Sequence, residues 1–344
     1  MADNSTYKAA GVDIDAGTEA VNRLKEYVRS TYTPDVASDV GGFGGMIRVP
    51  QSGMTDPILV SSIDGVGTKV KIAAMMNKYD TVGMDIVNHS VNDILVQGAK
   101  ALFFLDYFAT SALKPAMAAD IVKGMSAACR EVGCALIGGE IAEMPGVYVS
   151  GEFDIAGCIV GIVDRPKIID GSKVRPGDVV LGLKSSGPHT NGYSLIRKIF
   201  FDDNSFKVTD EIDELGCTLG EALLAPHRCY GNPIHKLIPE VEIHAMAHLT
   251  GGGFYNNIPR VLPEGCGMEI DNGSWDVLPI FKLIGKTANI DFFEMHRTFN
   301  MGIGMVVVVS PEDADKAAEI LRANGETVYR IGKVVSGPRE VVIK

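Results

Sequence analysis

Several segments of the sequence combine glycine with charged or hydroxyl-bearing side chains, which is a combination suited to binding phosphates. Residues 61–69 read S-S-I-D-G-V-G-T-K, between an apolar strand-like stretch and a helix-like one. Backbone N–H groups and the dipole at the start of a helix favour a bound anion. Asp64 is then placed for a cation and Lys69 for a phosphate. An ordinary turn is an equal alternative, because the run lacks the spacing of a P-loop.

Carboxylates beside glycines occur in two further segments of the first half. One reads N-H-S-V-N-D and ends at Asp93, and the other is Gly138-Gly139-Glu140. Such carboxylates suit Mg²⁺, which prefers oxygen ligands and is commonly shared with substrate phosphates. The structural alternative is that Asp93 caps a helix and that Glu140 pairs with a lysine.

The second half holds two histidines next to glycine- and hydroxyl-rich loops. Residues 185–192 read S-S-G-P-H-T-N-G with His189, and residues 248–253 read H-L-T-G-G-G with His248. Each loop follows an expected strand and precedes an expected helix, a geometry that suits anions. A lone histidine is usually structural, but two in this setting favour a functional role.

Two N-terminal segments add a lysine and more glycines. Lys8 lies in a polar stretch in which a solvated lysine is the ordinary interpretation, and residues 41–45 read G-G-F-G-G. Glycines permit positive φ and close approach of the backbone to a ligand. A tight turn explains the glycine run equally well.

Alternating strand-like and helix-like stretches would position these segments. In the first half we expect strands at 58–63, 101–108 and 155–163 and a helix at 118–132. In the second half we expect a strand at 179–183, a helix from Gly192, a strand at 305–309, a helix at 311–324 and a last strand at 327–335.

The chain length favours two domains, because 344 residues exceed what a single hydrophobic core usually serves. Residues 164–178 are rich in turn formers and charges, which is typical of a boundary. We therefore predict a junction near residue 172, with an ATP-binding and dimerisation domain at 1–172 and an α/β domain contributing to the substrate site at 173–344.

Composition excludes several classes of protein. A net charge of −11 gives no basic footprint for a nucleic acid. No apolar run approaches the ~20 residues that cross a bilayer, and the first residues lack the order of a secretory signal. No two of the six cysteines have C-x-x-C spacing, so we expect reduced thiols in a cytoplasmic protein.

Taken together, these segments resemble the phosphoribosylformylglycinamidine cyclo-ligase family. The resemblance rests on Y-K-A-A-G-V-D-I-D-A-G, G-G-F-G-G, D-G-V-G-T-K, V-N-D-I-L-V-Q-G-A, G-G-E-I-A-E-M-P-G, S-S-G-P-H-T-N-G-Y-S-L-I-R, H-L-T-G-G-G-F and T-F-N-M-G-I-G-M, in that order. The chain departs from the family at Ile141, where threonine is usual, and at Ser90, where cysteine is common.

The resemblance implies a fold and a set of partners. The fold would be α+β, a two-domain subunit with mixed sheets, and the N-terminal sheets of two subunits would join into a barrel across a homodimer interface. ATP would be bound in the N-terminal domain near that interface, together with Mg²⁺. The other partner would be a phosphorylated ribonucleotide, with no nucleic acid and no membrane involved.

The resemblance also assigns site residues. It implies catalytic roles for His189, Lys69 and Lys8, metal binding by Asp64 and Asp93, ATP binding by Gly44, Gly45, Asp64, Gly65, Gly67, Thr68, Lys69, Asp93, Gly138, Gly139 and Glu140, and substrate binding by Ser186, His189, Asn191, His248, Thr250, Gly251 and Gly252.

The implied reaction is ring closure of formylglycinamidine ribonucleotide, driven by ATP through phosphorylation of the formyl oxygen. His189 would take up the proton that the attacking nitrogen releases. Thiamine-monophosphate kinase and a non-catalytic nucleotide-binding regulator are the alternatives. Selenophosphate synthesis and hydrogenase maturation fit poorly, because no cysteine precedes Cys129 and none stands at the C-terminal end.

Overall fold

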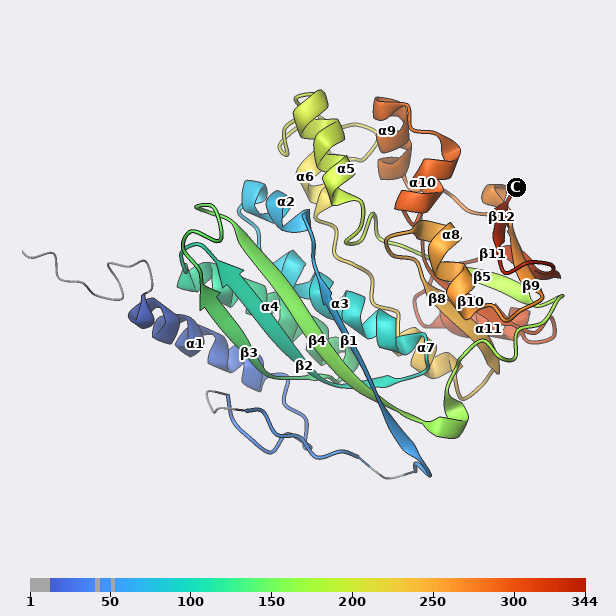
Figure 1. The fold of residues 1–344 in the computed structure, drawn as a ribbon, viewed down its shortest axis with the longest axis horizontal. Coiled ribbons are helices and arrows are strands. Elements are labelled where there is room, and N and C mark those ends of the chain that lie inside the picture. The colour runs from blue at the N-terminus through green and yellow to red at the C-terminus, as the bar shows by residue number, and fades with distance from the viewer. Residues whose placement is uncertain (1–12, 41–43, 51–52) are drawn as a thin grey trace, which may run out of the picture.

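The computed structural model describes residues 13–40, 44–50 and 53–344, and it contains two large sheets that lie side by side (Figure 1). The first sheet has the strand order β1-β4-β2-β3. Its only parallel pair is β2 with β3, so the sheet is mixed. Its strands are β1 (Pro57–Gly65), β2 (Lys100–Thr110), β3 (Ala135–Glu143) and β4 (Phe153–Asp164).

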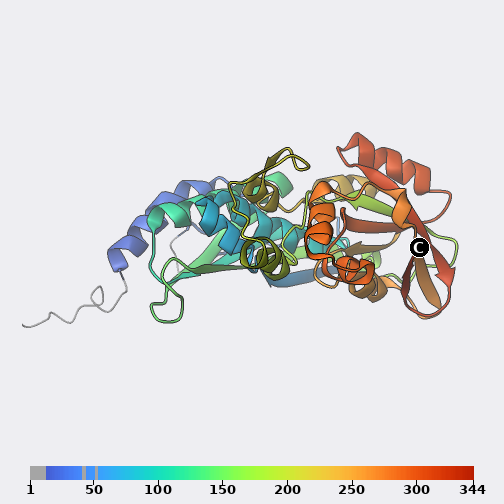
Figure 2. The same ribbon diagram turned by 90° about the horizontal axis from the view of Figure 1, so that it is seen from above.

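Helices cover one face of this sheet (Figures 1 and 2). They are α1 (Ile14–Arg29), α3 (Asp80–Leu95) and α4 (Pro115–Val132), and the short α2 (Lys69–Met76) follows β1. Pro115 stands in the first turn of α4, and Gly133 ends this helix in the left-handed conformation. Phe104, Phe108 and Ile159 point from the sheet into the core beneath these helices.

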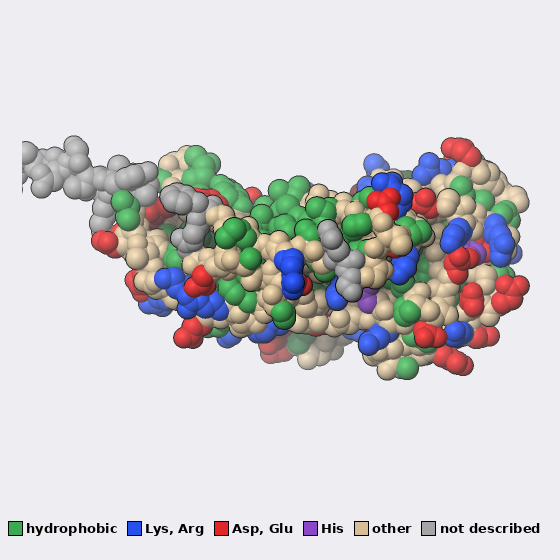
Figure 3. Space-filling view, turned by 90° about the horizontal axis from the view of Figure 1, so that it is seen from below, with side chains coloured by type: hydrophobic (Ala, Val, Ile, Leu, Met, Phe, Trp, Pro, Cys, Tyr) green, Lys and Arg blue, Asp and Glu red, His purple; other side chains and the backbone are tan. Residues whose placement is uncertain are grey.

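The opposite face of the first sheet is open and apolar. The strand register places Ile63, Cys158 and Leu105 in one row across the sheet. Ile63 is 73% exposed and Leu59 is 58% exposed on this face. Hydrophobic side chains gather along this side of the surface (Figure 3). Large exposed apolar patches of this kind usually mark interaction sites.

The second sheet has six strands in the order β12-β9-β11-β5-β10-β8. Strand β10 is buried along its whole length, because helices cover both faces of the sheet. The strands are β5 (Val179–Lys184), β8 (Ile243–His248), β9 (Cys266–Ile270), β10 (Ile303–Val309), β11 (Val328–Ser336) and β12 (Val341–Ile343). The helices are α5 (Tyr193–Arg197), α6 (Leu219–Leu223), α7 (Gly231–Leu237), α8 (Gly253–Asn257), α9 (Pro279–Ala288), α10 (Phe292–Thr298) and α11 (Ala314–Ala323), and β6 (Glu211–Ile212) pairs with β7 (Cys217–Thr218).

The structure corrects two expected boundaries in the second half. Helix α11 begins at Ala314 rather than at Pro311, because the backbone N–H of Asp313 donates a hydrogen bond to the Ser310 hydroxyl in a turn before it. Strand β11 is not the last strand, since β12 follows and pairs in parallel with β9. A three-residue edge strand is too short to show alternation in the sequence.

The connection between the two sheets runs from Asp164 to Val179. The predicted junction near residue 172 falls within this connection, and the division into domains at that residue remains our proposal. No helix of the described residues has the length and apolar character needed to span a membrane.

Candidate active site

Two carboxylates of the first half lie next to the same imidazole. Asp64 stands near the end of β1 and Asp93 in the last turns of α3. His89 Nε2 is 2.7 Å from Asp64 Oδ2 and 3.4 Å from Asp93 Oδ2. Because residues four apart share one face of a helix, α3 presents His89 and Asp93 together. The side chain of Asp64 is 42% exposed, so this group opens to solvent.

Histidines of the second half complete the group. His248, the last residue of β8, has Nδ1 2.8 Å from Asp93 Oδ1. His248 Nε2 lies 2.9 Å from Nε2 of His227, which stands between α6 and α7. We call Asp64, His89, Asp93, His227 and His248 the histidine–carboxylate cluster.

Polar side chains of α3 hold the second half against the first. Asn88 donates a hydrogen bond to the carbonyl of His227, and the backbone N–H of His227 donates to Asp85. Asn92 donates to the carbonyl of Arg228 and accepts from the backbone N–H of Tyr230. A helix with this many buried polar groups must have partners for them. Helix α3 therefore positions both sets of residues in the cluster.

The pKa values of the histidines in the cluster are shifted in opposite directions. Burial disfavours a charged His89, but hydrogen bonds with Asp64 and Asp93 outweigh it and raise its pKa to about 9. For His227 and His248, burial dominates and lowers the pKa, although Asp93 opposes the shift at His248. The pKa of Asp93 lies below its usual value despite burial, because His248 and His89 donate to it. The charged groups of the cluster are thus His89, Asp64 and Asp93.

The structure does not place His189 at the solvent-facing side of the cluster. Its ring is fully buried and stacks on His227 with centroids 3.9 Å apart. His189 Nε2 accepts weak hydrogen bonds from the backbone N–H groups of Ser186 and Arg228. Burial, followed by the nearby charge of His248, keeps its pKa well below the usual value. The ring as placed here cannot touch a substrate, which speaks against the expected proton transfer by His189.

Lys69 also lies away from the position expected of a phosphate-binding residue. Its ammonium group is completely buried and lies 2.8 Å from Asp85 Oδ2. It donates further hydrogen bonds to the carbonyls of His189 and Ala225. With three acceptors already in place, Lys69 joins the two halves of the chain and does not face a phosphate. Lys8 lies outside the described residues.

The glycine loop before Lys69 does face the second half. Gly67 has a φ of +65°, and the nearest atom to a side chain built there is the carbonyl oxygen of Thr190. Thr68 Oγ1 lies 3.1 Å from the hydroxyl of Ser194 in α5. The backbone N–H of Gly65 donates a hydrogen bond to the side chain of Asp64, which holds the turn. The loop from Asp64 to Thr68 therefore lies beside the loop that was expected to bind the ribonucleotide.

The expected substrate loops of the second half also lie close together. A side chain built on Gly251 would lie 3.3 Å from Asn191 Oδ1. The carbonyl oxygens of Thr250 and Gly251 accept hydrogen bonds from Asn257, and Gly252 has a φ of +95°. Ser186, in contrast, uses its hydroxyl to bond the carbonyl of Pro226. These loops have left-handed residues, a backbone conformation that suits anion binding.

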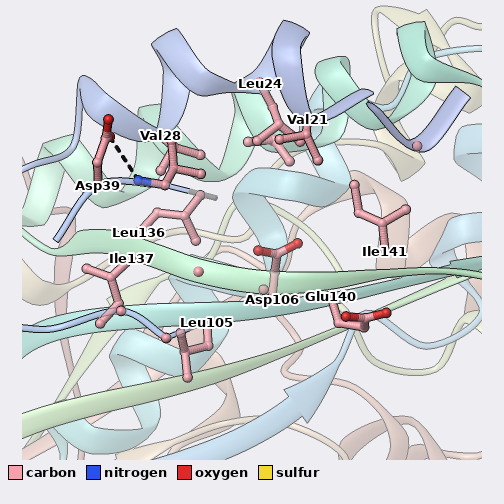
Figure 4. A pocket seen from close by; sticks show the side chains of 17 residues that line it. Val21, Leu24, Val28, Asp39, Leu105, Asp106, Leu136, Ile137, Glu140 and Ile141 are labelled. Carbon is pink, nitrogen blue, oxygen red and sulfur yellow. Dashed lines mark hydrogen bonds between the residues drawn. The ribbon is translucent and has the colours of Figure 1, made fainter. Parts of the chain in front are cut away.

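The remaining expected ATP-binding residues line a separate cavity. Gly44, Gly45, Gly138, Gly139 and Glu140 border a cavity of about 650 Å³ between α1 and strands β2 and β3. Figure 4 shows Asp106 pointing toward α1 and Glu140 pointing away from it. The structure thus divides the predicted site into the cluster with its neighbouring loops and this cavity.

Close approach explains two of the cavity's glycines. A side chain on Gly139 would lie 2.2 Å from Asp106 Oδ1, and one on Gly45 would lie 2.6 Å from the carbonyl oxygen of Ile137. Neither residue has positive φ among the described backbone angles. These glycines make room for packed neighbours. Burial raises the pKa of Asp106 to about 7, because no cationic partner opposes it among the described residues.

Three residues of the site and the cavity, His89, His227 and Asp106, were not predicted from the sequence. The four-residue spacing of His89 and Asp93 was a usable signal for His89. His227 and Asp106 gave none, because both acquire their neighbours only through tertiary contacts.

The chain belongs to a known class of protein. The chain matches the family models for AIR synthase related proteins, with the N-terminal domain at residues 45–163 and the C-terminal domain at residues 175–344. Solved structures share the fold at low identity. A thiamine-monophosphate kinase from Stenotrophomonas maltophilia superposes with a TM-score of 0.70 at 14% identity, over 95% of this chain and 96% of that one. The hydrogenase maturation protein HypE in complex with ATP gives 0.65 at 19% identity, over 94% and 90%.

Closer relatives define the family within this class. A phosphoribosylformylglycinamidine cyclo-ligase from Brevibacillus brevis is 52% identical over 339 residues, covering 98% of each chain. One from Acetivibrio thermocellus is 52% identical over 332 residues, covering 96% of this chain and 97% of the relative. The chain belongs to the phosphoribosylformylglycinamidine cyclo-ligase family.

Proposed function

We propose that this chain uses ATP to close the imidazole ring of aminoimidazole ribonucleotide in purine biosynthesis, starting from formylglycinamidine ribonucleotide and releasing ADP and phosphate. Membership of the family at about half identity over nearly the whole chain supports this function. The structural observation that carries it is that Asp64 and Asp93 of the first half meet at His89, and that Asp93 also contacts His248 of the second half.

The reaction needs activation because a formamide carbonyl resists attack by nitrogen. Transfer of the γ-phosphoryl group of ATP to the formyl oxygen converts that oxygen into a phosphate leaving group. The amidine nitrogen then attacks the formyl carbon and loses a proton, and the C–O bond to phosphate breaks. The protein mainly supplies positioning and charge stabilisation.

The residues present fit a magnesium ion at Asp64 and Asp93. Both carboxylates are partly exposed, and among the described residues neither forms an ion pair with a lysine or an arginine. Mg²⁺ commonly uses one or two carboxylates, waters and substrate phosphates as ligands. When bound there, the ion would neutralise the charge of the transferred phosphoryl group.

His248 is better placed than His189 to act at the proposed cation site. It touches Asp93 directly, whereas His189 lies behind His227. His248 Nδ1 lies 2.8 Å from Asp93 Oδ1 and its Nε2 lies 2.9 Å from His227 Nε2, so neither ring nitrogen is left for a proton from the substrate. We therefore propose that His248 positions Asp93 at the cation site, and that neither His189 nor His248, as placed here, takes up the proton.

We place the nucleotide along the loop of Asp64 to Thr68 and the ribonucleotide along the loops at Asn191 and at Thr250 to Gly252. The cavity beside Gly138 and Gly139 provides apolar walls suited to a base. ATP bound to the HypE neighbour, which shares this fold, is compatible with a nucleotide in the first half of the chain.

The open face of the first sheet supports a homodimer. Pairing two such faces would bury Leu59 and Ile63 and would allow the sheets to close into a barrel. Ile63→Glu should therefore shift the protein toward monomer in sedimentation velocity, while Val342→Glu on the second sheet should not. A dimer that is unaffected by Ile63→Glu would exclude this face as the interface. A cytoplasmic location remains a prediction from the sequence.

The direct test is incubation of the protein with ATP, Mg²⁺ and formylglycinamidine ribonucleotide. We expect aminoimidazole ribonucleotide and phosphate in equal amounts. Asp64→Asn should abolish turnover with the fold intact, whereas Asp315→Asn, at a surface residue 87% exposed, should leave it unchanged. ATP binding without ring closure would instead support a regulator, and phosphorylation of thiamine monophosphate would support the kinase alternative.

A further inference from the structure

Two imidazoles flank the carboxylates to which the proposed function assigns magnesium. His89 Nε2 lies 2.7 Å from Asp64 Oδ2, and His248 Nδ1 lies 2.8 Å from Asp93 Oδ1. One ligand atom from each of His89, Asp93 and His248 falls within 4.8 Å of the others. Ligand atoms around a tetrahedral ion are about 3.3 Å apart, given ligand bonds of about 2.0–2.2 Å. Small side-chain shifts would open this group around a metal ion.

The two carboxylates alone suit magnesium, but together with the two imidazoles they form a donor set that magnesium does not prefer. Mg²⁺ is bound almost entirely by oxygen, whereas imidazole nitrogen suits zinc, cobalt, nickel and copper. Two nitrogens and two carboxylates are typical of a transition-metal site. From these contacts we infer that His89, His248, Asp93 and Asp64 form a site that binds a divalent transition-metal ion more tightly than Mg²⁺.

The neighbours of both imidazoles support this inference. A histidine that binds a metal through one ring nitrogen usually hydrogen-bonds through the other, which fixes the ring. His89 Nδ1 lies 2.8 Å from the hydroxyl of Thr190, and His248 Nε2 lies 2.9 Å from His227 Nε2. Thr190 and His227 thus hold the two rings with His89 Nε2 and His248 Nδ1 directed at the carboxylates.

Exposure indicates an open coordination position. His89 and His248 are nearly buried, whereas the side chains of Asp64 and Asp93 are 42% and 25% exposed. An ion held here would reach solvent on the carboxylate side, as ions that bind a substrate do. The inference rests on the proposed cation site at Asp64 and Asp93 but not on ring closure.

A second histidine group nearby is less suitable. His189, His227 and His248 also lie within 4.8 Å of one another. His189 Nε2, however, is the acceptor for the backbone N–H groups of Ser186 and Arg228, and a metal ion bound there would leave both groups without that partner. This triad also has no carboxylate to balance the charge of the ion.

Titration of the nucleotide-free protein with Co²⁺ tests the inference, because the visible absorption of Co²⁺ reports nitrogen ligands and low coordination number. We expect one Co²⁺ per chain, bound at least about 100-fold more tightly than Mg²⁺, and displaced by Zn²⁺. His89→Gln should weaken binding of Co²⁺ at least tenfold and change its spectrum. His235→Gln, a histidine away from the cluster, is the matched control and should bind like the parent.

Thr190→Val offers a second variant that keeps all four ligands. It should weaken Co²⁺ about 10- to 100-fold, the usual effect of losing the partner of a metal-bound histidine. Equal affinities for Co²⁺ and Mg²⁺, or unchanged Co²⁺ binding in a folded His89→Gln protein, would overturn the inference. So would loss of binding in His189→Asn together with retention in His89→Gln. Ring closure with Mg²⁺ but no tight Co²⁺ would remove this inference alone, and tight Co²⁺ without ring closure would remove the proposed function alone.

Discussion

The ammonium group of Lys69 lies 2.8 Å from the carboxylate of Asp85, and both side chains are completely buried. Lys69 begins α2, Asp85 belongs to α3, and the carbonyls that complete the shell of Lys69 come from residues 189 and 225. Lys69 thus pairs with Asp85 inside the first half of the chain and, through its two other hydrogen bonds, connects that half with two loops of the second.

Removal of one member of this pair should destabilise the protein strongly. We expect Lys69→Met to lower the free energy of unfolding by about 3–5 kcal/mol, because it leaves a buried carboxylate without its partner. Urea denaturation measures this change. The double variant Lys69→Met with Asp85→Leu should recover part of the loss. A normal unfolding free energy for Lys69→Met, combined with a large rise in KM for ATP, would instead return Lys69 to the phosphate.

The two histidines of the second half should differ in their effect on catalysis. We expect His248→Gln to lower kcat about 10- to 100-fold, the usual effect of losing the hydrogen-bond partner of a metal-binding group. His189→Asn should stay within tenfold of the parent, since the ring lies behind His227 and asparagine tolerates the φ of +61° at this position. Steady-state kinetics with both substrates distinguishes them. The reverse order of effects would restore the proton transfer to His189.

Two adjacent glycines in β3 should respond differently to the same substitution. In Gly139→Ala the new methyl group would lie 2.2 Å from Asp106 Oδ1 and 2.6 Å from the backbone oxygen of Asp106, so we expect a clear drop in melting temperature. In Gly138→Ala the nearest atom is a methyl carbon of Leu105 at 3.5 Å, which is ordinary contact. Thermal melting of the two variants compares them directly. Equal melting temperatures would contradict the packing explanation for Gly139.

The half-buried carboxyl group of Asp106 should make stability depend on pH. Burial raises its pKa from 3.8 to about 7, so the folded protein keeps a proton that the unfolded chain loses above pH 4. The stability that this protonated group contributes is therefore fully present below pH 4, declines as the pH rises toward 7 and stays constant above that. Asp106→Asn removes this decline.

Urea denaturation of the parent and Asp106→Asn at pH 5 and pH 8 measures the effect. We expect the variant to gain stability relative to the parent between the two pH values, since one pKa unit corresponds to about 1.4 kcal/mol. Parallel pH profiles for the two proteins would show that the carboxyl group ionises at its ordinary pKa in the folded state.

Much of the fold could be predicted from the sequence, because most strands and helices are indicated by the pattern of apolar residues within each segment. Strands at 58–63, 101–108 and 155–163 and the helix at 118–132 fall within β1, β2, β4 and α4. Of the expected α+β fold, the combination of helices and strands and the two mixed sheets are confirmed. Strand β12 was missed because three residues gain their ladder only from β9.

The candidate site was predictable only where neighbours in the sequence are neighbours in space. Asp64 and Asp93 were chosen from local patterns, and the structure brings both to His89. Lys69 was read as a phosphate ligand from its glycine loop, but its direction depends on Asp85 and on carbonyls more than 100 residues away.

The amino-acid sequence by itself determined the family, the glycine loops and the carboxylates, because these depend on residue identity and short spacing. Tertiary structure alone decided which of these groups meet. Burial placed His189 and Lys69 in the interior, and the packing of α3 against residues 225–230 brought His227 and His248 to the carboxylates of the first half. The physical reason is that desolvation and hydrogen-bond partners, which set what a side chain can do, come from residues distant in the chain.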